Sequence, residues 1–490
     1  MPTTEPAPVT LEQVYEALAQ GRVSQIDGML GRFPSALRLR HPFAIALRAM
    51  QSILGGDVPS GVALLRRAIE HSDRVARQYF VDIMVPHLIT VTDVAGIEEA
   101  LDSAGEAVPE LVPAFLAFRS VAAARAGRDK QSRDLGAEAT RLARTNDNPM
   151  IRARVMYRCS LAAFYREDYA EATERALEAA RSYERLDAPR NAANAYSLLC
   201  VLAHEWSGDP DVARIWAERL TMSAAVANDL SLQNYGLISQ LDIAAEAGDT
   251  RRLGSVRARL LASQLHEQYV ERFTFVLAET LFSAWSGSFG RARAGIEGLI
   301  SSERGSMSES ATCEAMLALF AAAEWDIDSA RRHAHRALGQ TVHHEVHEPL
   351  FDSRRRRIAR VLAACACTII GEGTRGRRAL SRTFDPDGYF ANGDLTRGLD
   401  EAKAPPLMRG YARLINVVAA AAARNRPRLG LTHTETQLLR ALPDGKTIKA
   451  IAAEFRKSPK TIERQVGSIY DKLHVSNRAQ AIQRARELGL

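Results

Sequence analysis

The stretch "SPKTIERQVGSIYDKL" (residues 458–473) has the pattern of an amphipathic helix that begins at its first two residues. A serine hydroxyl can accept a free backbone N–H at a helix start, and proline suits the first helical position because it has no N–H to leave unpaired. Apolar residues recur at helical spacing and predict one buried face, whereas the opposite face is polar and partly basic. The predicted buried face consists of Ile462, Val466, Ile469 and Leu473, and the outward face carries Lys460, Arg464, Gly467, Ser468 and Asp471, with Glu463 and Gln465 on its flanks.

Two shorter helices are expected before this one and another after it. Thr432 stands three residues before Glu435, which is the capping-box spacing of a helix start. A turn at "PDGK" (residues 443–446) separates that helix from a second one at 447–455, and a fourth helix is expected to start near Ser476 or Asn477. Two helices joined by a tight turn, the second with a polar outer face, form the helix-turn-helix arrangement that places a recognition helix in the DNA major groove.

The last sixty or so residues resemble a LuxR-type DNA-binding domain. The resemblance implies the helix-turn-helix fold, double-stranded DNA as a partner and dimer contacts through the fourth helix, residues 476–488; it also admits RNA polymerase as a partner. The chain departs from the family pattern at Ala450, Glu463 and Gln465, which concerns the preferred DNA sequence rather than the fold. The matching positions are Leu431, Thr432, Glu435, Leu439, Gly445, Ile451, Ala452, Ser458, Thr461, Ile469, Lys472, Leu473, Val475, Arg478 and Ala479.

The outward face predicts how this helix would contact DNA. The guanidinium of Arg464 can pair with two acceptors of guanine, Gln465 can pair with adenine, and Glu463 can only accept, which favours a cytosine amino group. The alternative, ordinary solvated surface charges, is less favoured for the set because fold, spacing and charge agree. Base contacts are assigned to Glu463, Arg464, Gln465 and Gly467. Phosphate and positioning contacts, which do not specify bases, are assigned to Lys449, Lys457, Lys460, Thr461, Ser468, Lys472 and Arg478.

The distribution of charge agrees with a DNA-binding C-terminal domain. Residues 427–490 contain 12 Lys and Arg against 6 Asp and Glu, and subtracting these from the chain totals of 64 and 58 leaves 52 against 52 for residues 1–426. The whole excess of positive charge therefore lies in the C-terminal domain, as expected of a module that binds a polyanion. With 46% hydrophobic and 25% charged residues, the composition is that of a folded chain.

A different pattern recurs over residues 1–345. A helix ends in a short turn, and a second helix follows with an alanine five positions after the turn; successive turns are 35 to 41 residues apart. This regularity is typical of stacked helical hairpins and resembles tetratricopeptide repeats, with units longer than the usual length of about 34 residues. Alanines 172, 213, 292 and 330 are expected where the two helices of a hairpin cross closely. The turns are placed at Gly21, Gly56, Gly127, Glu167, Gly208, Gly248, Gly287 and Trp325, with a weaker one at Thr92.

Such an array forms a superhelix whose concave surface usually binds a peptide, a protein segment or a small ligand, so it is the candidate sensor. With the C-terminal domain, the layout resembles large LuxR-type regulators whose helical repeats receive a signal. The "GKT" at 445–447 lacks the glycine five residues earlier and follows no strand, so it is not a phosphate loop. No ATPase activity and no cofactor are therefore expected.

Two clusters of polar residues admit other roles. His343 and His347 would share a helical face near Glu348, but the segment has no cysteine and no HExxH order, so a solvated surface is preferred to a metal site. The run "RRRR" at 354–357 could contact DNA or an acidic partner, although such runs are usually solvated. The complete histidine cluster is His333, His335, His343, His344 and His347.

The remaining sequence sets the compartment and the domain boundaries. Five scattered cysteines without a CxxC pair predict reduced core residues. The sequence shows neither a leader pattern, which would predict export, nor an apolar run of about 18 residues, which would predict a membrane span, so a cytoplasmic location is expected.

The loop-rich segment 371–406 is followed by an apolar helix at 407–425. This helix is interpreted as a connector buried against the last repeat or as a dimer helix, with burial preferred. Residues 426–430 form a short hinge. The expected domains are 1–345, 346–426 and 427–490.

The sequence thus predicts an all-α regulator of transcription with no enzymatic activity, in which a tetratricopeptide-like array senses a ligand or protein and a LuxR-type domain binds specific DNA as a homodimer. Two alternatives remain. One is a DNA-localised scaffold whose repeats hold a protein partner. The other, weaker, is a metal-dependent enzyme that uses the histidine cluster.

Overall fold

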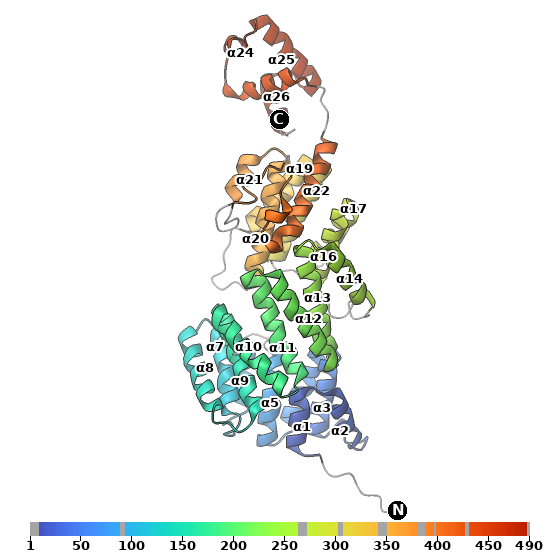
Figure 1. Cartoon of the computed structure of the whole chain (residues 1–490), viewed down its shortest axis with the longest axis vertical. Coiled ribbons are helices and arrows are strands. Elements are labelled where there is room, and N and C mark those ends of the chain that lie inside the picture. The colour runs from blue at the N-terminus through green and yellow to red at the C-terminus, as the bar shows by residue number, and fades with distance from the viewer. Residues whose placement is uncertain are drawn as a thin grey trace, which may run out of the picture. The chain divides into compact units, whose positions relative to one another are not determined.

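The computed structural model describes residues 9–88, 94–262, 272–301, 307–341, 350–380, 388–395, 398–426 and 431–487. Within these ranges the regular structure is helical and contains no strand, so the predicted all-α class is confirmed. The chain divides into two compact units (Figure 1). Unit 1 comprises residues 1–244 and 251–271, and unit 2 comprises residues 245–250 and 272–490.

Unit 1 is a succession of helical hairpins in which the helices from α1 to α12 pack against their neighbours in sequence. The last residues of α13 and the turn to α14 belong to unit 2. The helices are α1 (Leu11–Gln20), α2 (Val23–Gly31), α3 (Pro42–Leu54), α4 (Val58–Glu70), α5 (Arg74–Leu88), α6 (Val94–Ser103), α7 (Val112–Arg125), α8 (Asp129–Ala143), α9 (Pro149–Tyr165), α10 (Tyr169–Arg185), α11 (Pro189–Val201), the π-helix η1 (Leu202–Ser207), α12 (Pro210–Val226), α13 (Leu230–Glu246) and α14 (Thr250–Ala262).

The predicted hairpin turns share one backbone conformation. Every predicted turn within the described residues has a positive φ, in the left-handed region that allows the chain to leave a helix sharply. Six of these eight positions are glycine, which has no Cβ to clash there, whereas Glu167 and Trp325 adopt φ of 62° and 64° as non-glycine residues. The turn placements are therefore confirmed, and the weaker one at Thr92 lies outside the described residues.

In four hairpins the left-handed residue is followed directly by an aspartate that caps the next helix. The Asp57 carboxylate accepts a hydrogen bond from the N–H of Ser60 at 3.1 Å. In the other three hairpins the capping aspartate likewise accepts the N–H of the residue three positions later. The carboxylate satisfies a donor that the first helical turn leaves unpaired and also carries the negative charge favoured at a helix N-terminus. These caps are Asp57, Asp168, Asp209 and Asp326.

Small side chains let the hairpin helices approach each other closely. The four alanines expected at the helix crossings are all buried, with at most 1% of their surface exposed. An alanine at such a crossing places only a methyl group between the two backbones. A larger residue would force the helices apart. The alanines are 172, 213, 292 and 330.

A buried ionic cluster joins three helices of unit 1 that are distant in sequence. The Asp82 carboxylate on α5 is 2.7 Å from the guanidinium of Arg154 and 2.8 Å from that of Arg158, both on α9, and it accepts a 2.8 Å hydrogen bond from the Tyr15 hydroxyl of α1. Burial would raise the pKa of Asp82, but Arg158 and Arg154 outweigh it and hold that pKa below its usual value. Arg158 also stacks on Phe118, with its Cζ 3.6 Å from the ring centroid. The cluster therefore attaches the first helix to later hairpins.

Outside residues 431–487, unit 2 is built around a helix that is buried along almost its whole length. This helix, α18, packs against α17, α19, α20 and α22. The helices of the unit are α16 (Arg272–Trp285), α17 (Phe289–Ile300), α18 (Met307–Ala323), α19 (Ile327–Gln340), α20 (Leu350–Ile369), α21 (Gly373–Ala379), the short 3₁₀ helices η2 (Glu401–Lys403) and η3 (Pro406–Met408), α22 (Arg409–Asn425), α23 (His433–Ala441), the 3₁₀ helix η4 (Leu442–Asp444), α24 (Ile448–Glu454), α25 (Pro459–Leu473) and α26 (Arg478–Glu487).

The apolar helix expected at 407–425 is α22, and its broad apolar face is covered by α16, α18 and α20. Tyr411, Leu414, Ile415 and Val418 are fully buried. Its second residue, Gly410, receives a 3.0 Å hydrogen bond from Trp285 Nε1 at its carbonyl. Burial against the preceding helices, the preferred interpretation, is confirmed for this helix.

Two arginines of the run near the start of α20 pair with carboxylates within unit 2. Arg354 pairs with Glu246, and Arg355 pairs with Glu309 at 2.8 Å while its guanidinium stacks on Phe273. Arg356 is 5% exposed. The solvated face favoured by the sequence is therefore wrong for Arg354–Arg356, because Arg354 and Arg355 have acidic or aromatic partners elsewhere in unit 2 and Arg356 is buried.

The five cysteines are buried and unpaired, as expected of reduced core residues. Burial raises the pKa of the Cys200 and Cys313 thiols to about 12, so these groups are not nucleophiles near neutral pH. In the ranges that the structure describes, no helix combines the length and the apolar character that crossing a membrane requires.

Candidate nucleic-acid interface

Helix α25, residues 459–473, is the candidate recognition helix. Its cap is Ser458, whose hydroxyl oxygen accepts the N–H of Thr461 at 3.2 Å, and Pro459 occupies the first helical position. The helix ends at His474, which has a left-handed φ of 54°. The predicted start and the predicted buried stripe are confirmed, since Ile462, Val466, Ile469 and Leu473 are at most 6% exposed.

A core of its own holds α25 in place. The stripe packs against Leu438, Leu439, Leu442, Ile451, Ala452, Ala481 and Ala485, which come from α23, η4, α24 and α26. Helix α24 is capped by Thr447 and spans seven residues, slightly less than expected. The turn to α25 passes through Arg456 with a φ of 52°, so a left-handed residue sets the angle between the two helices of the helix-turn-helix.

Glu435 connects the start of α23 to the recognition helix. It forms the predicted capping box with Thr432, and its two carboxylate oxygens also accept bonds from Ser468 Oγ at 2.8 Å and Lys472 Nζ at 2.6 Å. Lys472, the Thr432 N–H and Ser468 together lower the pKa of Glu435 to about 2. The capping spacing predicts only the bond to Thr432. The bonds to α25 depend on tertiary packing, which local spacing does not reveal.

Arg478 makes a second structural connection. Its guanidinium donates to the carbonyl oxygens of Leu442 and Lys446, at 2.5 Å and 2.7 Å respectively. The Leu442 carbonyl lies at the C-cap of α23, where η4 begins, and the Lys446 carbonyl lies in the turn before α24; helix ends leave such carbonyls without an intrahelical partner. Arg478 therefore fixes the turn that precedes the helix-turn-helix.

The four residues assigned to base contacts lie on one side of α25, away from the core. Glu463 and Arg464 are exposed, and Gln465 and Gly467 are half-buried. The Gln465 side-chain oxygen accepts a 3.2 Å bond from Lys457 Nζ, which leaves its amide N–H groups directed elsewhere. The outward face thus presents a guanidinium, with a carboxylate and an amide on its flanks, and these are groups that pair with base edges.

The residues assigned to phosphate contacts fall into two groups. Lys449 and Lys460 are exposed, while Lys457 is half-buried beside Gln465. The others have partners inside the domain: the Thr461 hydroxyl lies 2.8 Å from that of Ser458, Ser468 and Lys472 bind Glu435, and Arg478 binds the two carbonyls. The DNA contacts of all seven residues stay predictions, and the second group has a structural role as well.

The comparisons with known proteins add a family for this segment. Residues 429–485 match the family described as bacterial regulatory proteins, luxR family. The chain carries a LuxR-family helix-turn-helix domain. Among solved structures, that of Rap protein complexed with competence and sporulation factor is similar to this chain, with 13% sequence identity and a TM-score of 0.43 over 67% of this chain and 96% of that chain. No curated protein matches the chain.

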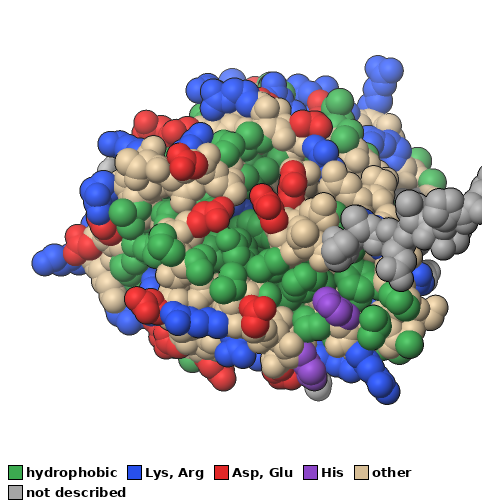
Figure 2. Space-filling model, turned by 90° about the horizontal axis from the view of Figure 1, so that it is seen from below, with side chains coloured by type: hydrophobic (Ala, Val, Ile, Leu, Met, Phe, Trp, Pro, Cys, Tyr) green, Lys and Arg blue, Asp and Glu red, His purple; other side chains and the backbone are tan. Residues whose placement is uncertain are grey.

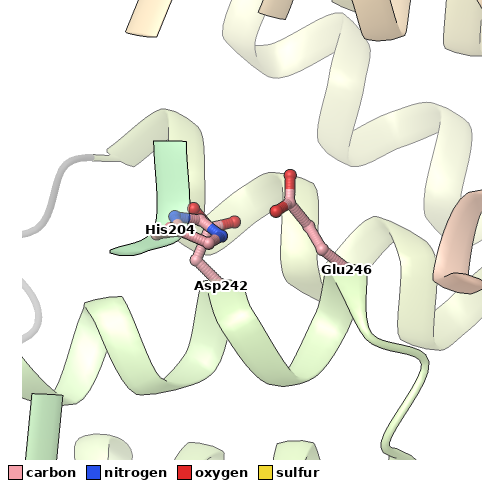
Figure 3. A group of neighbouring side chains, drawn as sticks. All are labelled: His204, Asp242 and Glu246. Atoms are coloured by element: carbon pink, nitrogen blue, oxygen red, sulfur yellow. The ribbon is translucent and has the colours of Figure 1, made fainter. Parts of the chain in front are cut away.

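A second group of titratable side chains lies outside the LuxR-family domain (Figure 3). His204 on η1 approaches Asp242 on α13, and its Nδ1 lies 3.0 Å from the carboxylate of Glu205. Glu246 follows Asp242 one helical turn later, and in unit 2 its carboxylate pairs with Arg354 and accepts a 3.3 Å bond from the Tyr411 hydroxyl. These protein partners account for the orientation of Glu246, and no cofactor is assigned to the group.

The histidine cluster expected near residue 340 is only partly described. His333 Nδ1 lies 2.6 Å from the carboxylate of Glu314, and His335 Nε2 lies 3.6 Å from that of Glu372. His343, His344 and His347 lie outside the described residues. The two described histidines thus bind different carboxylates, and the structure does not bring them to one metal site.

Proposed function

We propose that this protein is a sequence-specific DNA-binding regulator of transcription whose helical repeats receive a ligand or protein signal. The observation that carries the proposal is the outward surface of α25 in the LuxR-family domain, where Arg464 and Glu463 are exposed above a fully buried stripe. A bidentate guanidinium contact to guanine is the commonest specific contact in the major groove, and the exposed Lys449 of α24 and Lys460 of α25 supply phosphate contacts.

We further propose that two copies bind the operator. One short recognition helix covers only a few base pairs, so useful specificity requires a two-fold dimer on half-sites about one helical turn apart. Helix α26, within the segment 476–488, is the proposed dimer contact. Its exposed Gln480, Gln483 and Arg484 give it a polar outer surface beside the buried Ala481 and Ala485.

The helical hairpins are the proposed sensor, in a domain spanning residues 1–345, followed by a connecting region to residue 426 and the DNA-binding domain from residue 427. The hinge at 426–430 includes residues outside the described ranges. No enzymatic activity is assigned to either part.

Footprinting on genomic fragments tests the proposal directly. The expected result is protection of two similar half-sites with a common centre of symmetry, lost in an Arg464→Ala variant at the same protein concentration. Protection of a single asymmetric half-site would contradict the dimer. Uniform protection without sequence preference would contradict a role in reading bases.

A further inference from the structure

A groove of about 1520 Å³ opens on unit 1 at the edge where α5, α7 and α9 begin. Apolar residues from five segments line it, among them Leu11 and Tyr15 of α1, Tyr79 of α5 and Met150 of α9. Figure 2 shows an end face of the molecule on which hydrophobic side chains gather in a central hollow with carboxylates among them. The groove therefore offers apolar surface that a partner could cover.

The charge of this groove is of one sign. Five of its lining residues carry carboxylates, and none of its lining residues is Lys or Arg, although the chain as a whole has an excess of basic residues. A neighbouring hollow between α8 and α10 has both signs, with Arg144, Arg152, Arg175 and Arg185 beside three glutamates. The bias is therefore local to the groove. Its acidic lining residues are Glu12, Glu16, Glu106, Glu110 and Asp147, all exposed.

The described partners of these carboxylates leave most of their charge uncompensated. Glu110 accepts bonds from two neutral donors, the Tyr79 hydroxyl and the Asn148 amide, each at 3.1 Å. Glu16 accepts from the neutral amide of Gln20. Glu106 lies 3.5 Å from Arg74, in a pair whose two side chains are 69% and 91% exposed. Such an exposed pair contributes little, so the groove keeps a negative potential that attracts cations.

We propose that this groove binds an extended peptide segment in which Lys or Arg side chains alternate with aliphatic ones. Successive side chains of an extended chain point to opposite sides, so one side can cover the apolar floor while the other reaches the carboxylates at the rim. The volume exceeds the roughly 300–1,000 Å³ of small-molecule pockets, which favours a peptide over a metabolite. The proposal rests on the proposed function, because it names the class of signal that the helical array receives.

Polar groups at the rim fit the backbone of such a segment. The side chains of Gln20, Asn146 and Asn148 line the groove. Each amide nitrogen donates one hydrogen to Glu16 or Glu110 within unit 1, and its second hydrogen can donate to a peptide carbonyl. A nucleic acid or an acidic peptide would place further negative charge against the five carboxylates and is disfavoured by repulsion.

The test uses the full-length protein and a fluorescent peptide of alternating Lys and Leu, with a matched peptide of alternating Glu and Leu. Binding is followed by fluorescence anisotropy without DNA. The expected result is that the Lys-Leu peptide binds with an affinity that falls as salt rises, whereas the Glu-Leu peptide does not bind. The triple variant Glu12→Gln, Glu16→Gln, Glu106→Gln should weaken binding by about tenfold.

Two further variants keep the test decisive. Glu70→Gln, Glu174→Gln and Glu178→Gln together change the net charge equally outside the groove and should leave affinity unchanged. Val75→Lys places a cation at the rim, where this side chain is 45% exposed, and should weaken binding even if the triple variant folds poorly. Equal affinity of the wild-type protein and the groove variants, or equal binding of the Glu-Leu peptide, would overturn the proposal. Since the assay contains no DNA, either result leaves the DNA-binding proposal to be judged by footprinting.

Discussion

Lys472 Nζ lies 2.6 Å from a carboxylate oxygen of Glu435, although the two residues are 37 positions apart and on different helices. The same carboxylate caps α23 and accepts from Ser468, so one side chain orients the start of the domain and the middle of the recognition helix. These bonds restrict rotation of α25 about its helix axis and so fix which of its side chains face outward.

Replacing Glu435 with alanine should destabilise the LuxR-family domain by about 1–3 kcal/mol. The carboxylate is charged and only 5% exposed, and its removal leaves three hydrogen-bond donors without an acceptor. Hydrogen exchange of α23 and α25 in the intact chain measures the loss. The native pKa of about 2 lies below that of an unfolded glutamate, so the stabilisation is complete above about pH 5 and falls as pH drops toward 2. Protection that is unchanged between pH 5 and pH 3 would contradict this role.

Arg464→Ala should weaken binding to the cognate operator by about 1–3 kcal/mol and leave binding to random DNA nearly unchanged, because a base contact adds discrimination. Lys460→Ala is the matched control on the same helix. It should weaken both kinds of DNA alike and reduce the salt slope by about one. Electrophoretic mobility shifts over a range of salt concentrations measure both effects. Equal losses for Arg464→Ala on cognate and random DNA would argue against base contact.

Arg478→Ala should lower the stability of the domain by about 1–3 kcal/mol even in the absence of DNA, because two carbonyls lose a charged donor. Lys449→Ala, at an exposed position, should leave stability within about 0.5 kcal/mol of wild type. Hydrogen exchange of the segment around η4 and α24 distinguishes the two. If Arg478→Ala affects only DNA affinity, its bonds to Leu442 and Lys446 are not important for folding.

Asp82→Ala should destabilise the first hairpins of unit 1 by about 3–5 kcal/mol, because two buried guanidinium groups are left without their carboxylate. Asp102→Ala, which breaks an exposed pair with Arg119, should cost at most about 1 kcal/mol. The comparison is made by hydrogen exchange of α1, α5 and α9. Similar protection in both variants would show that the buried cluster adds little stability.

A fragment of residues 427–490 should fold alone, because the described core of the LuxR-family domain is built only from its own residues. It should bind DNA with an affinity that falls steeply as salt rises, since bound phosphates release counterions. Circular dichroism and a salt titration on the operator check the two expectations. A folded fragment that binds DNA no better than a neutral control protein would indicate that the rest of the chain contributes to the DNA-binding surface.

The turns and the short C-terminal helices could be predicted from the sequence because local residues determine them. Glycine at 208 followed by Asp209, or Ser458 followed by Pro459, specifies a backbone conformation and a cap within a few residues. The turn at Trp325 is predicted by its spacing and by the alanine five positions later, since tryptophan itself does not favour a positive φ.

What local sequence could not predict are the contacts between distant helices. The residues next to Arg355 in sequence do not reveal that its side chain contacts Glu309 and Phe273, so local sequence favours an exposed surface for that run. The π-helix at 202–207 likewise has no local signal in the sequence, because its residues would also suit an α-helix. For the DNA interface, the sequence supplied the exposed face of α25 but not the internal bonds of Lys472 and Arg478.

The cluster around Asp82 also constrains the order in which unit 1 can be completed during synthesis. In most helical repeat arrays each hairpin needs only its neighbours, so the chain can fold hairpin by hairpin as it leaves the ribosome. Here the side chains of Tyr15 and Asp82 can contact their arginine partners only after Arg154 and Arg158 have been synthesised. The first five helices are therefore expected to wait, incompletely locked, until α9 emerges, and a nascent chain stopped before residue 154 should be far more sensitive to protease than one that extends past it.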